Sequence, residues 1–307
     1  MKKPTDIGAS VRDRLLRLAR DRGEDFQLVL LRYANERLLY RLATSKHGSR
    51  FVLKGAALFT LWTGTPHRAT RDLDLLGFGE ATESHILAVF NEVLATLVED
   101  DGVRFDASTL EVGQIREGQE YGGIRAEILA RIASAQVRLQ VDIGFGDAIT
   151  PAAVEIEFPA LLDFQAPKLH AYPRETVVAE KVEAMVQLGM ANSRMKDFYD
   201  VALLSRIFEF DGEILARAIR ATFDRRKTPI PAALPVALTS EFAEDASKKG
   251  QWSGFVRKSG AQDAGTLADV IASIVMFVEL PLRSAASGDA ITGHWPAGGP
   301  WTSARGG

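Results

Sequence analysis

The chain has 307 residues and a formal net charge of −3, with 46% hydrophobic and 25% charged residues. This balance is typical of a globular protein with a packed core, and the length allows about two domains at a prior of roughly 150 residues each. A slightly acidic chain does not coat nucleic acid through bulk charge. The absence of cysteine excludes disulfides, thiolate metal sites and cysteine nucleophiles, and it favours a cytoplasmic protein.

The amino terminus carries Lys2 and Lys3 but no apolar stretch behind them, so it does not have the pattern of a signal peptide. The apolar run at residues 270–278 is shorter than the roughly 20 residues that cross a bilayer. We therefore expect no membrane partner.

The first 45 residues are predicted to be helical, because apolar side chains recur every three or four positions. The predicted helices are residues 11–22 and 26–44. A short apolar strand at 51–53 then leads through the turn Lys54-Gly55 into a brief helix at 56–62.

A strand predicted at residues 71–76 carries the most informative pair of the chain, Asp72 and Asp74. Side chains alternate faces along a strand, so these two aspartates project together while the leucines between and after them turn to a core. Neighbouring carboxylates repel each other, which raises the pKa of one of them unless a cation lies between them. Hard divalent ions such as Mg²⁺ prefer carboxylate oxygens, so the pair is a candidate metal site.

An amphipathic helix is predicted next at 83–98, followed by an antiparallel meander bounded by glycines. The strands of the meander are residues 103–115, 124–133 and 136–145. The last strand adds Asp142, and three carboxylates converge at one end of a sheet if this strand pairs with the strand of Asp72 and Asp74. Such a trio can hold two Mg²⁺ ions, one on a nucleoside triphosphate and one on an acceptor hydroxyl.

Past residue 167 the periodicity is helical, and prolines between 150 and 170 indicate a boundary. The predicted helices are residues 174–188, 195–208, 211–226 and 267–282. We therefore expect an α/β (α+β) protein with a mixed or antiparallel sheet. Its expected parts are N-terminal helices at 1–45, a core at 46–165, a helical C-terminal domain at 166–286 and a flexible, glycine-rich tail at 287–307.

Each candidate residue also has an ordinary structural explanation. An Asp-x-Asp pair arises by chance among 40 acidic residues, and a lone strand aspartate is most often a satisfied edge residue. Lys181 would form a surface ion pair with Glu180 or Glu183, while Asp197 and Asp200 would lie on a solvated helix face. The fixed order of strand, glycine turn, short helix, Asp-x-Asp and later strand aspartate favours a nucleotide-transfer site.

Five motifs lie between residues 53 and 200. They are Leu53-Lys-Gly55, Arg68-x-Thr-x-Asp-Leu-Asp74, Val141-Asp-Ile-Gly144, Ala179-Glu-Lys-Val-Glu-Ala184 and Arg194-Met-Lys-Asp-Phe-Tyr-Asp200. On these motifs the chain resembles the AbiEii/MenT-like toxins, nucleotidyltransferases with a polymerase-β-type core, over residues 50–205 and more weakly to about 285. The resemblance implies Mg²⁺-dependent transfer of a nucleotide from a triphosphate to RNA (EC 2.7.7 type), with the tRNA 3′ end as acceptor. Aminoacylation and translation would be blocked, and a cognate antitoxin protein would relieve the arrest.

The same resemblance implies roles for single residues. Asp72 and Asp74 correspond to the metal-binding pair, and Asp142 to a third carboxylate that helps to deprotonate the acceptor hydroxyl. Lys181 corresponds to a triphosphate contact and Asp197 to a late active-site acid. The implied nucleotide-binding residues are Lys54, Gly55, Ala56, Arg68, Arg71, Lys181 and Asp200.

The first turn departs from the family pattern, because Ala56 and Ala57 follow Gly55 where the family often has a Ser or Thr hydroxyl for a phosphate. Backbone N–H groups still point from the short helix, and Thr70 is a substitute for the hydroxyl. Two other functions stay open. One is transfer to a small hydroxylated molecule, as in antibiotic-modifying relatives; the other is a non-catalytic partner-binding module in which the aspartate pair is structural.

Overall fold

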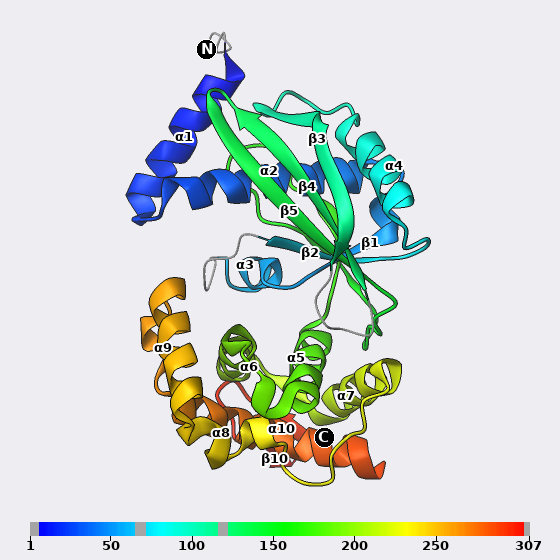
Figure 1. Ribbon diagram of the computed structural model, residues 1–307, viewed down its shortest axis with the longest axis vertical. Helices are drawn as coiled ribbons and strands as arrows, with labels where there is room; N and C mark the ends of the chain where they lie inside the picture. Colours follow the sequence, from blue (N-terminus) through cyan, green and yellow to red (C-terminus); the bar gives the residue numbers. More distant parts are fainter. Residues whose placement is uncertain (1–5, 65–71, 116–121, 304–307) are drawn as a thin grey trace. The chain divides into compact units, whose positions relative to one another are not determined.

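The computed structural model describes residues 6–64, 72–115 and 122–303, which divide into two compact units (Figure 1). The first unit is Met1–Gly146 with Val154–Ala171, and the second is Asp147–Ala153 with Tyr172–Gly307. The N-terminal helices therefore belong to the same unit as the sheet. A short segment, Asp147–Ala153, belongs to the second unit although its neighbours in sequence lie in the first.

The first unit is a mixed sheet with helices. Its helices are α1 (Ile7–Arg22), α2 (Phe26–Thr44), α3 (Ala57–Thr63) and α4 (Glu83–Leu94), with a 3₁₀ turn η1 (Gly48–Arg50). Its strands are β1 (Phe51–Lys54), β2 (Asp72–Gly77), β3 (Val103–Ile115), β4 (Gly123–Ile132), β5 (Ala135–Phe145), β6 (Val154–Glu157) and β7 (Lys168–Ala171). The predicted α/β fold with a mixed sheet is confirmed.

The sheet has seven strands in the order β3-β4-β5-β2-β1-β7-β6. The predicted antiparallel meander β3-β4-β5 is confirmed, and β5 pairs with β2 in parallel, as the convergence of the three aspartates requires. Strand β1 pairs antiparallel with β2 and parallel with β7. Strand β2 therefore lies inside the sheet, between β5 and β1.

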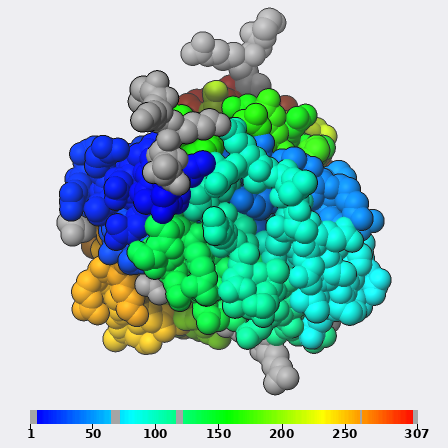
Figure 2. All heavy atoms as spheres, turned by 90° about the horizontal axis from the view of Figure 1, so that it is seen from above, coloured from blue at the N-terminus to red at the C-terminus, as the bar shows by residue number. Residues whose placement is uncertain are grey.

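Apolar and polar side chains alternate along the strands, so one face of the sheet is apolar. Helices cover this apolar face. In β2, Leu73 and Leu75 are buried while Asp72 and Asp74 are only partly covered. The core joins apolar side chains of α1 and α2 to those of β4 and β5, including Leu30, Ile128 and Leu139. Figure 2 shows the blue atoms of the N-terminal helices beside the cyan and green atoms of β3 to β5. The apolar face of the sheet therefore packs against α1 and α2.

The second unit is helical. Its main helices are α5 (Arg174–Leu188), α6 (Met195–Ile207), α7 (Gly212–Arg226), α8 (Ser240–Glu244), α9 (Ala246–Ser259) and α10 (Leu267–Ser287). It also contains 3₁₀ turns η2 (Gly189–Ala191), η3 (Val236–Leu238) and η4 (Gln262–Ala264), and strands β8 (Phe210–Asp211), β9 (Gly293–Trp295) and β10 (Thr302–Ser303). The helical C-terminal region was predicted, but α8 and α9 were not.

Helix α10 extends beyond the apolar run at residues 270–278, from which we predicted that no segment spans a membrane. It has 21 residues, and among the described residues it is the one helix whose length and composition suffice to cross a membrane. Within the second unit it packs against α6 and α7 and buries Ile274, Phe277 and Val278. These contacts are those of a core helix.

The predicted flexible tail at 287–307 is corrected for its described part. Strands β9 and β10 form a small antiparallel sheet with β8. The indole of Trp295 is buried and donates a hydrogen bond of 2.7 Å to the carbonyl of Ser205. Trp301 donates one of 2.9 Å to the carbonyl of Phe277. The glycine content indicated flexibility, whereas the two tryptophans supply enough apolar surface to hold the segment.

Candidate active site

The predicted carboxylates meet on the outer face of the sheet. Asp74 on β2 lies directly opposite Asp142 on the parallel strand β5, and Asp72 lies opposite Gln140. Residues opposite each other on neighbouring strands point to the same face, so the three aspartates share one face. Asp72 and Asp74 could be predicted as a pair because residues two positions apart on a strand project from the same face.

The turn after β1 is built around Asp74. Lys54 is the residue of β1 opposite Asp74, and Gly55 follows it with φ of +73°. A Cβ placed on Gly55 would lie 2.0 Å from Oδ2 of Asp74, a distance that non-bonded atoms do not adopt. The Asp74 carboxylate therefore rests on the backbone of the turn, and the turn requires glycine for both its conformation and its space. Two of the predicted nucleotide-binding residues, Lys54 and Gly55, adjoin the aspartate pair.

Asp142 is held by a cation of the protein itself. Arg125 on β4 donates from Nε to Oδ1 at 2.8 Å and from Nη2 to Oδ2 at 2.9 Å. The amide of Gln140 lies 3.3 and 3.4 Å from the same two oxygens. The hydrogen bond to Asp142, with the further attraction of Asp72, raises the pKa of Arg125, while partial burial opposes the change. This guanidinium is therefore a permanent positive charge on the face of the aspartates.

Asp72 and Asp74 fit a hard divalent cation, but the full trio does not form a ready metal centre. Mg²⁺ is commonly bound by one or two carboxylates, with substrate phosphates and water completing its shell. Among residues 6–64, 72–115 and 122–303, no three His, Asp or Glu side chains are arranged to hold a metal ion. The expected three-carboxylate centre stays a prediction, and in the structure Arg125 and Gln140 contact the oxygens of Asp142.

Lys181, Asp197 and Asp200 form an ion cluster within the second unit. Nζ of Lys181 on α5 lies 2.6 Å from Oδ1 of Asp197 and 2.9 Å from Oδ2 of Asp200, both on α6. Nε of Arg194 donates to the other oxygen of Asp197 at 2.7 Å. The side chains of Asp197 and Asp200 are 1% and 0% exposed. The solvated helix face considered for these two aspartates is therefore wrong.

Asp197 stays ionised because two positive charges lie beside it. Burial alone would raise the pKa of Asp197, but the attraction of Lys181 and Arg194 outweighs it and lowers that pKa below the ordinary value. A buried carboxylate needs such partners, since an uncompensated charge in the interior is strongly unfavourable. Lys181 thus lies in a fixed position between two carboxylates.

The glutamates that flank Lys181 have a different partner. Arg226 on α7 contacts Glu183 at 2.7 Å, and Glu180 and Asp147 at 3.4 Å each. The structure thus pairs these glutamates with Arg226 on α7, and it pairs Lys181 with Asp197 and Asp200 on α6. The motif around Lys181 therefore contributes to two ion clusters, one with residues of α6 and one with Arg226 of α7.

Some of the predicted nucleotide-binding residues lie outside the described part of the chain. Arg68 and Arg71 lie outside the described residues, as does Thr70. Ala56 is buried and immediately precedes α3, so it offers only its backbone. Arg125 was not predicted from the sequence. The two-residue turn between Ile132 and Ala135 fixes which residues of β4 and β5 face each other, and this register places Arg125 opposite Asp142. The turn was therefore the signal from which the pair could have been predicted.

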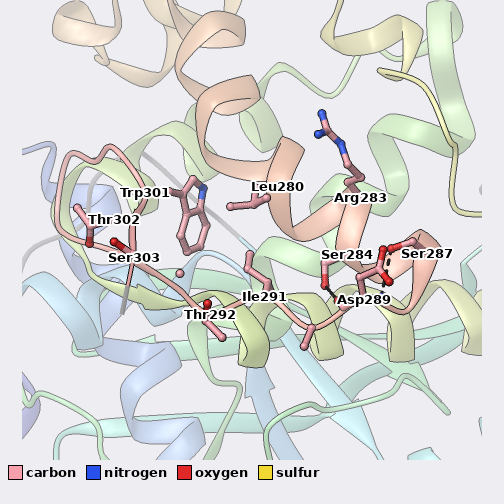
Figure 3. Close-up of a pocket in the computed structure, with 12 residues that line it drawn as sticks. Leu280, Arg283, Ser284, Ser287, Asp289, Ile291, Thr292, Trp301, Thr302 and Ser303 are labelled. Carbon is pink, nitrogen blue, oxygen red and sulfur yellow. Dashed lines mark hydrogen bonds between the residues drawn. The ribbon is translucent and has the colours of Figure 1, made fainter. Parts of the chain in front are cut away.

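A cavity of about 440 Å³ in the second unit lies apart from the predicted residues (Figure 3). It is bordered by the end of α10 and by the segment around Trp301. Its polar groups are engaged locally, since Oγ of Ser284 donates to the carbonyl of Asp289 at 2.7 Å and Arg283 pairs with Glu279. None of the predicted site residues lines it, and we assign it no role.

Comparisons with known proteins show a family and a fold. The family model for the nucleotidyl transferase AbiEii toxin of type IV toxin–antitoxin systems matches residues 37–270. No curated protein matches the chain. The structure of JHP933 from Helicobacter pylori is similar with a TM-score of 0.50 and 13% identity, covering 86% of this chain and 95% of that one. A candidate nucleotidyltransferase from H. pylori has a TM-score of 0.51 and 14% identity, covering 87% of this chain and 100% of its own. At these identities the two structures support the fold alone.

Proposed function

Because this chain belongs to the AbiEii family of nucleotidyl transferase toxins, we propose that it transfers a nucleoside monophosphate from a nucleoside triphosphate to the 3′ end of tRNA in the cytoplasm, with Mg²⁺ as cofactor. One observation supports this most strongly. Asp72 and Asp74 project from the same face of β2, and the Asp74 carboxylate rests on the glycine turn that follows β1.

The reaction forms one bond and breaks one. The 3′-hydroxyl of the acceptor attacks the α-phosphorus, the bond between the α-phosphorus and its bridging oxygen breaks, and pyrophosphate leaves with the electron pair. Mg²⁺ bound at Asp72 and Asp74 would neutralise charge on the phosphates. Such a transfer depends mainly on positioning, and the turn at Gly55 keeps Asp74 in one place.

We propose for single residues the roles that the family resemblance implies. Lys181 is proposed as the triphosphate contact and Asp197 as a late acid. Asp142, whose two oxygens each accept one hydrogen bond from Arg125, is proposed to assist loss of the hydroxyl proton. Lys54, Arg68, Arg71 and Asp200 are proposed to contact the nucleotide. Blocking the acceptor end would stop aminoacylation and translation, and an antitoxin protein is the expected partner of a family assigned to type IV systems.

The test supplies each of the four labelled triphosphates with total RNA, in Mg²⁺ and in a chelator. We expect label on tRNA-sized RNA only with Mg²⁺. Asp72→Asn and Asp74→Asn should abolish it, while Asp163→Asn, at a residue whose side chain is 97% exposed, should not. Label on a small molecule but not on RNA would instead support the antibiotic-modifying alternative. No Mg²⁺-dependent label, together with no protection from thermal unfolding by any triphosphate, would support the non-catalytic alternative.

A further inference from the structure

Arg125 and Asp142 form a planar pair across the β4-β5 hairpin. The two residues are direct register partners, and both point to the face that carries Asp72 and Asp74. The two hydrogen bonds of 2.8 and 2.9 Å run in parallel from the guanidinium to the two carboxylate oxygens. Paired, charge-assisted hydrogen bonds of this kind fix both groups in orientation.

Both oxygens of Asp142 are already engaged by side chains of the protein. A carboxylate offers about four acceptor positions, two on each oxygen. In Asp142 each oxygen accepts from Arg125 and, at the longer distances of 3.3 and 3.4 Å, from Gln140. A cation that approached Asp142 would have to displace a guanidinium of like charge.

The same guanidinium acts on the neighbouring acids. Arg125 is attracted by Asp72 and Glu127 as well as by Asp142. Its side chain is 40% exposed and that of Asp142 is 20% exposed, so the pair lies at the surface of the face rather than in the core. Loss of Arg125 would therefore leave several carboxylates on one face without this positive charge, and would open Asp142 to a cation from solvent.

We propose that Arg125 takes the place of a second divalent cation at Asp142, so that the protein binds a single divalent cation, at Asp72 and Asp74. The proposal rests on the metal pair of the proposed function and makes Arg125 a positioning residue. Asp142 is kept beside Asp74 by the protein's own charge, and the metal and its phosphate ligands are assigned to Asp72 and Asp74.

The test counts bound Mn²⁺ per chain by electron paramagnetic resonance of the free ion and by calorimetry, without nucleotide. We expect one ion in the wild type, two in Arg125→Met and one in the double variant Arg125→Met/Asp142→Asn. Arg125→Lys keeps the positive charge and should bind one. Asp142→Asn alone, which needs no change at Arg125, should leave the count at one.

Thermal unfolding gives a second readout. In a chelator, Arg125→Met should melt below the wild type because the carboxylates repel, and Mn²⁺ should raise its melting temperature by more than it raises that of the wild type. A count of two in the wild type that falls to one in Asp142→Asn would overturn the inference while leaving the proposed function intact. A count of one in a folded Arg125→Met would also overturn it. No Mn²⁺ binding by the wild type would overturn the metal pair itself, and the inference with it.

Discussion

The Cα of Gly55 lies so close to the carboxylate of Asp74 that no side chain fits between them. Gly55→Ala would place a methyl group 2.0 Å from Oδ2 of Asp74 and would strain a backbone with φ of +73°. We expect a loss of about 1–3 kcal/mol in the free energy of unfolding from the strain. The displaced carboxylate should lower nucleotidyl transfer by roughly 100-fold, the scale of a displacement of about 1 Å in an active site.

A matched control separates strain from displacement. Gly23 has φ of +63° in the same unit, and a Cβ there would meet nothing within 4 Å. Gly23→Ala should lower stability by about 1 kcal/mol and leave transfer unchanged. If Gly55→Ala and Gly23→Ala had equal activity, the contact with Asp74 would have no part in the reaction.

Lys181→Ala should affect folding as well as triphosphate use. The substitution removes the cation that lies between the buried Asp197 and Asp200, while Arg194 still pairs with Asp197. Removal of one partner from a buried ion cluster lowers the free energy of unfolding by about 3–5 kcal/mol. Urea unfolding should show this loss, and it should shrink in the background Asp197→Asn/Asp200→Asn, where no buried charge is stranded.

Acid should weaken the same cluster. The folded pKa of Asp197 lies below its ordinary value of 3.8, so its contribution to stability is present above that value and is lost as the pH falls through the folded pKa. Wild type and Asp197→Asn should therefore converge in stability at acidic pH. Parallel stability curves down to strong acid would contradict the role of the ion cluster.

Local patterns were enough to predict the elements that carry the site. The helix predicted at 26–44 and the strand predicted at 103–115 have the observed bounds of α2 and β3. Their apolar spacing and the turns at their ends act within a few residues, so a single sequence contains the information. The four-residue strands β6 and β7 were missed because they are short and lie among prolines, and their place in the sheet depends on long-range pairing.

The candidate site was predictable in its composition but not in its partners. The period of two placed Asp72 and Asp74 together, whereas the link from Arg125 to Asp142 depends on which residues face each other across a hairpin. Helical spacing likewise indicated only residues of α5 as ion-pair partners of Lys181. Its observed partners come from α6, and that choice is made by the packing of two helices.

Trp295 should be the strongest anchor of the C-terminal segment. Its indole is 3% exposed, lies 5.0 Å from the ring of Phe277 and donates to the carbonyl of Ser205. Trp295→Ala removes a large buried side chain and should lower the free energy of unfolding by about 3–5 kcal/mol. Met276→Ala on α10 is a control, because Met276 is 62% exposed and should change stability by less than about 0.5 kcal/mol. Equal unfolding midpoints for the two variants would show that the segment is dispensable.

Glu36 should make the stability of the first unit depend on pH near neutrality. Its side chain is buried, close to Arg37 and accepting from the backbone N–H of Leu161 at 2.7 Å. Burial raises its pKa from 4.5 to about 7, although Arg37 and that hydrogen bond act in the opposite direction. Between these two values the folded chain binds a proton that the unfolded chain has released, so stability falls as the pH rises from about 4.5 to about 7.

Glu36→Gln should remove this dependence while keeping an acceptor for Leu161. At about 1.4 kcal/mol for each pH unit between the two pKa values, the variant should gain about 3 kcal/mol relative to the wild type when the pH is raised from 4 to 8. Urea unfolding across this range measures the difference, with Glu99→Gln, at an exposed residue, as the control. A difference between wild type and Glu36→Gln that does not change with pH would mean that Glu36 is ionised throughout, held by Arg37 as a buried ion pair.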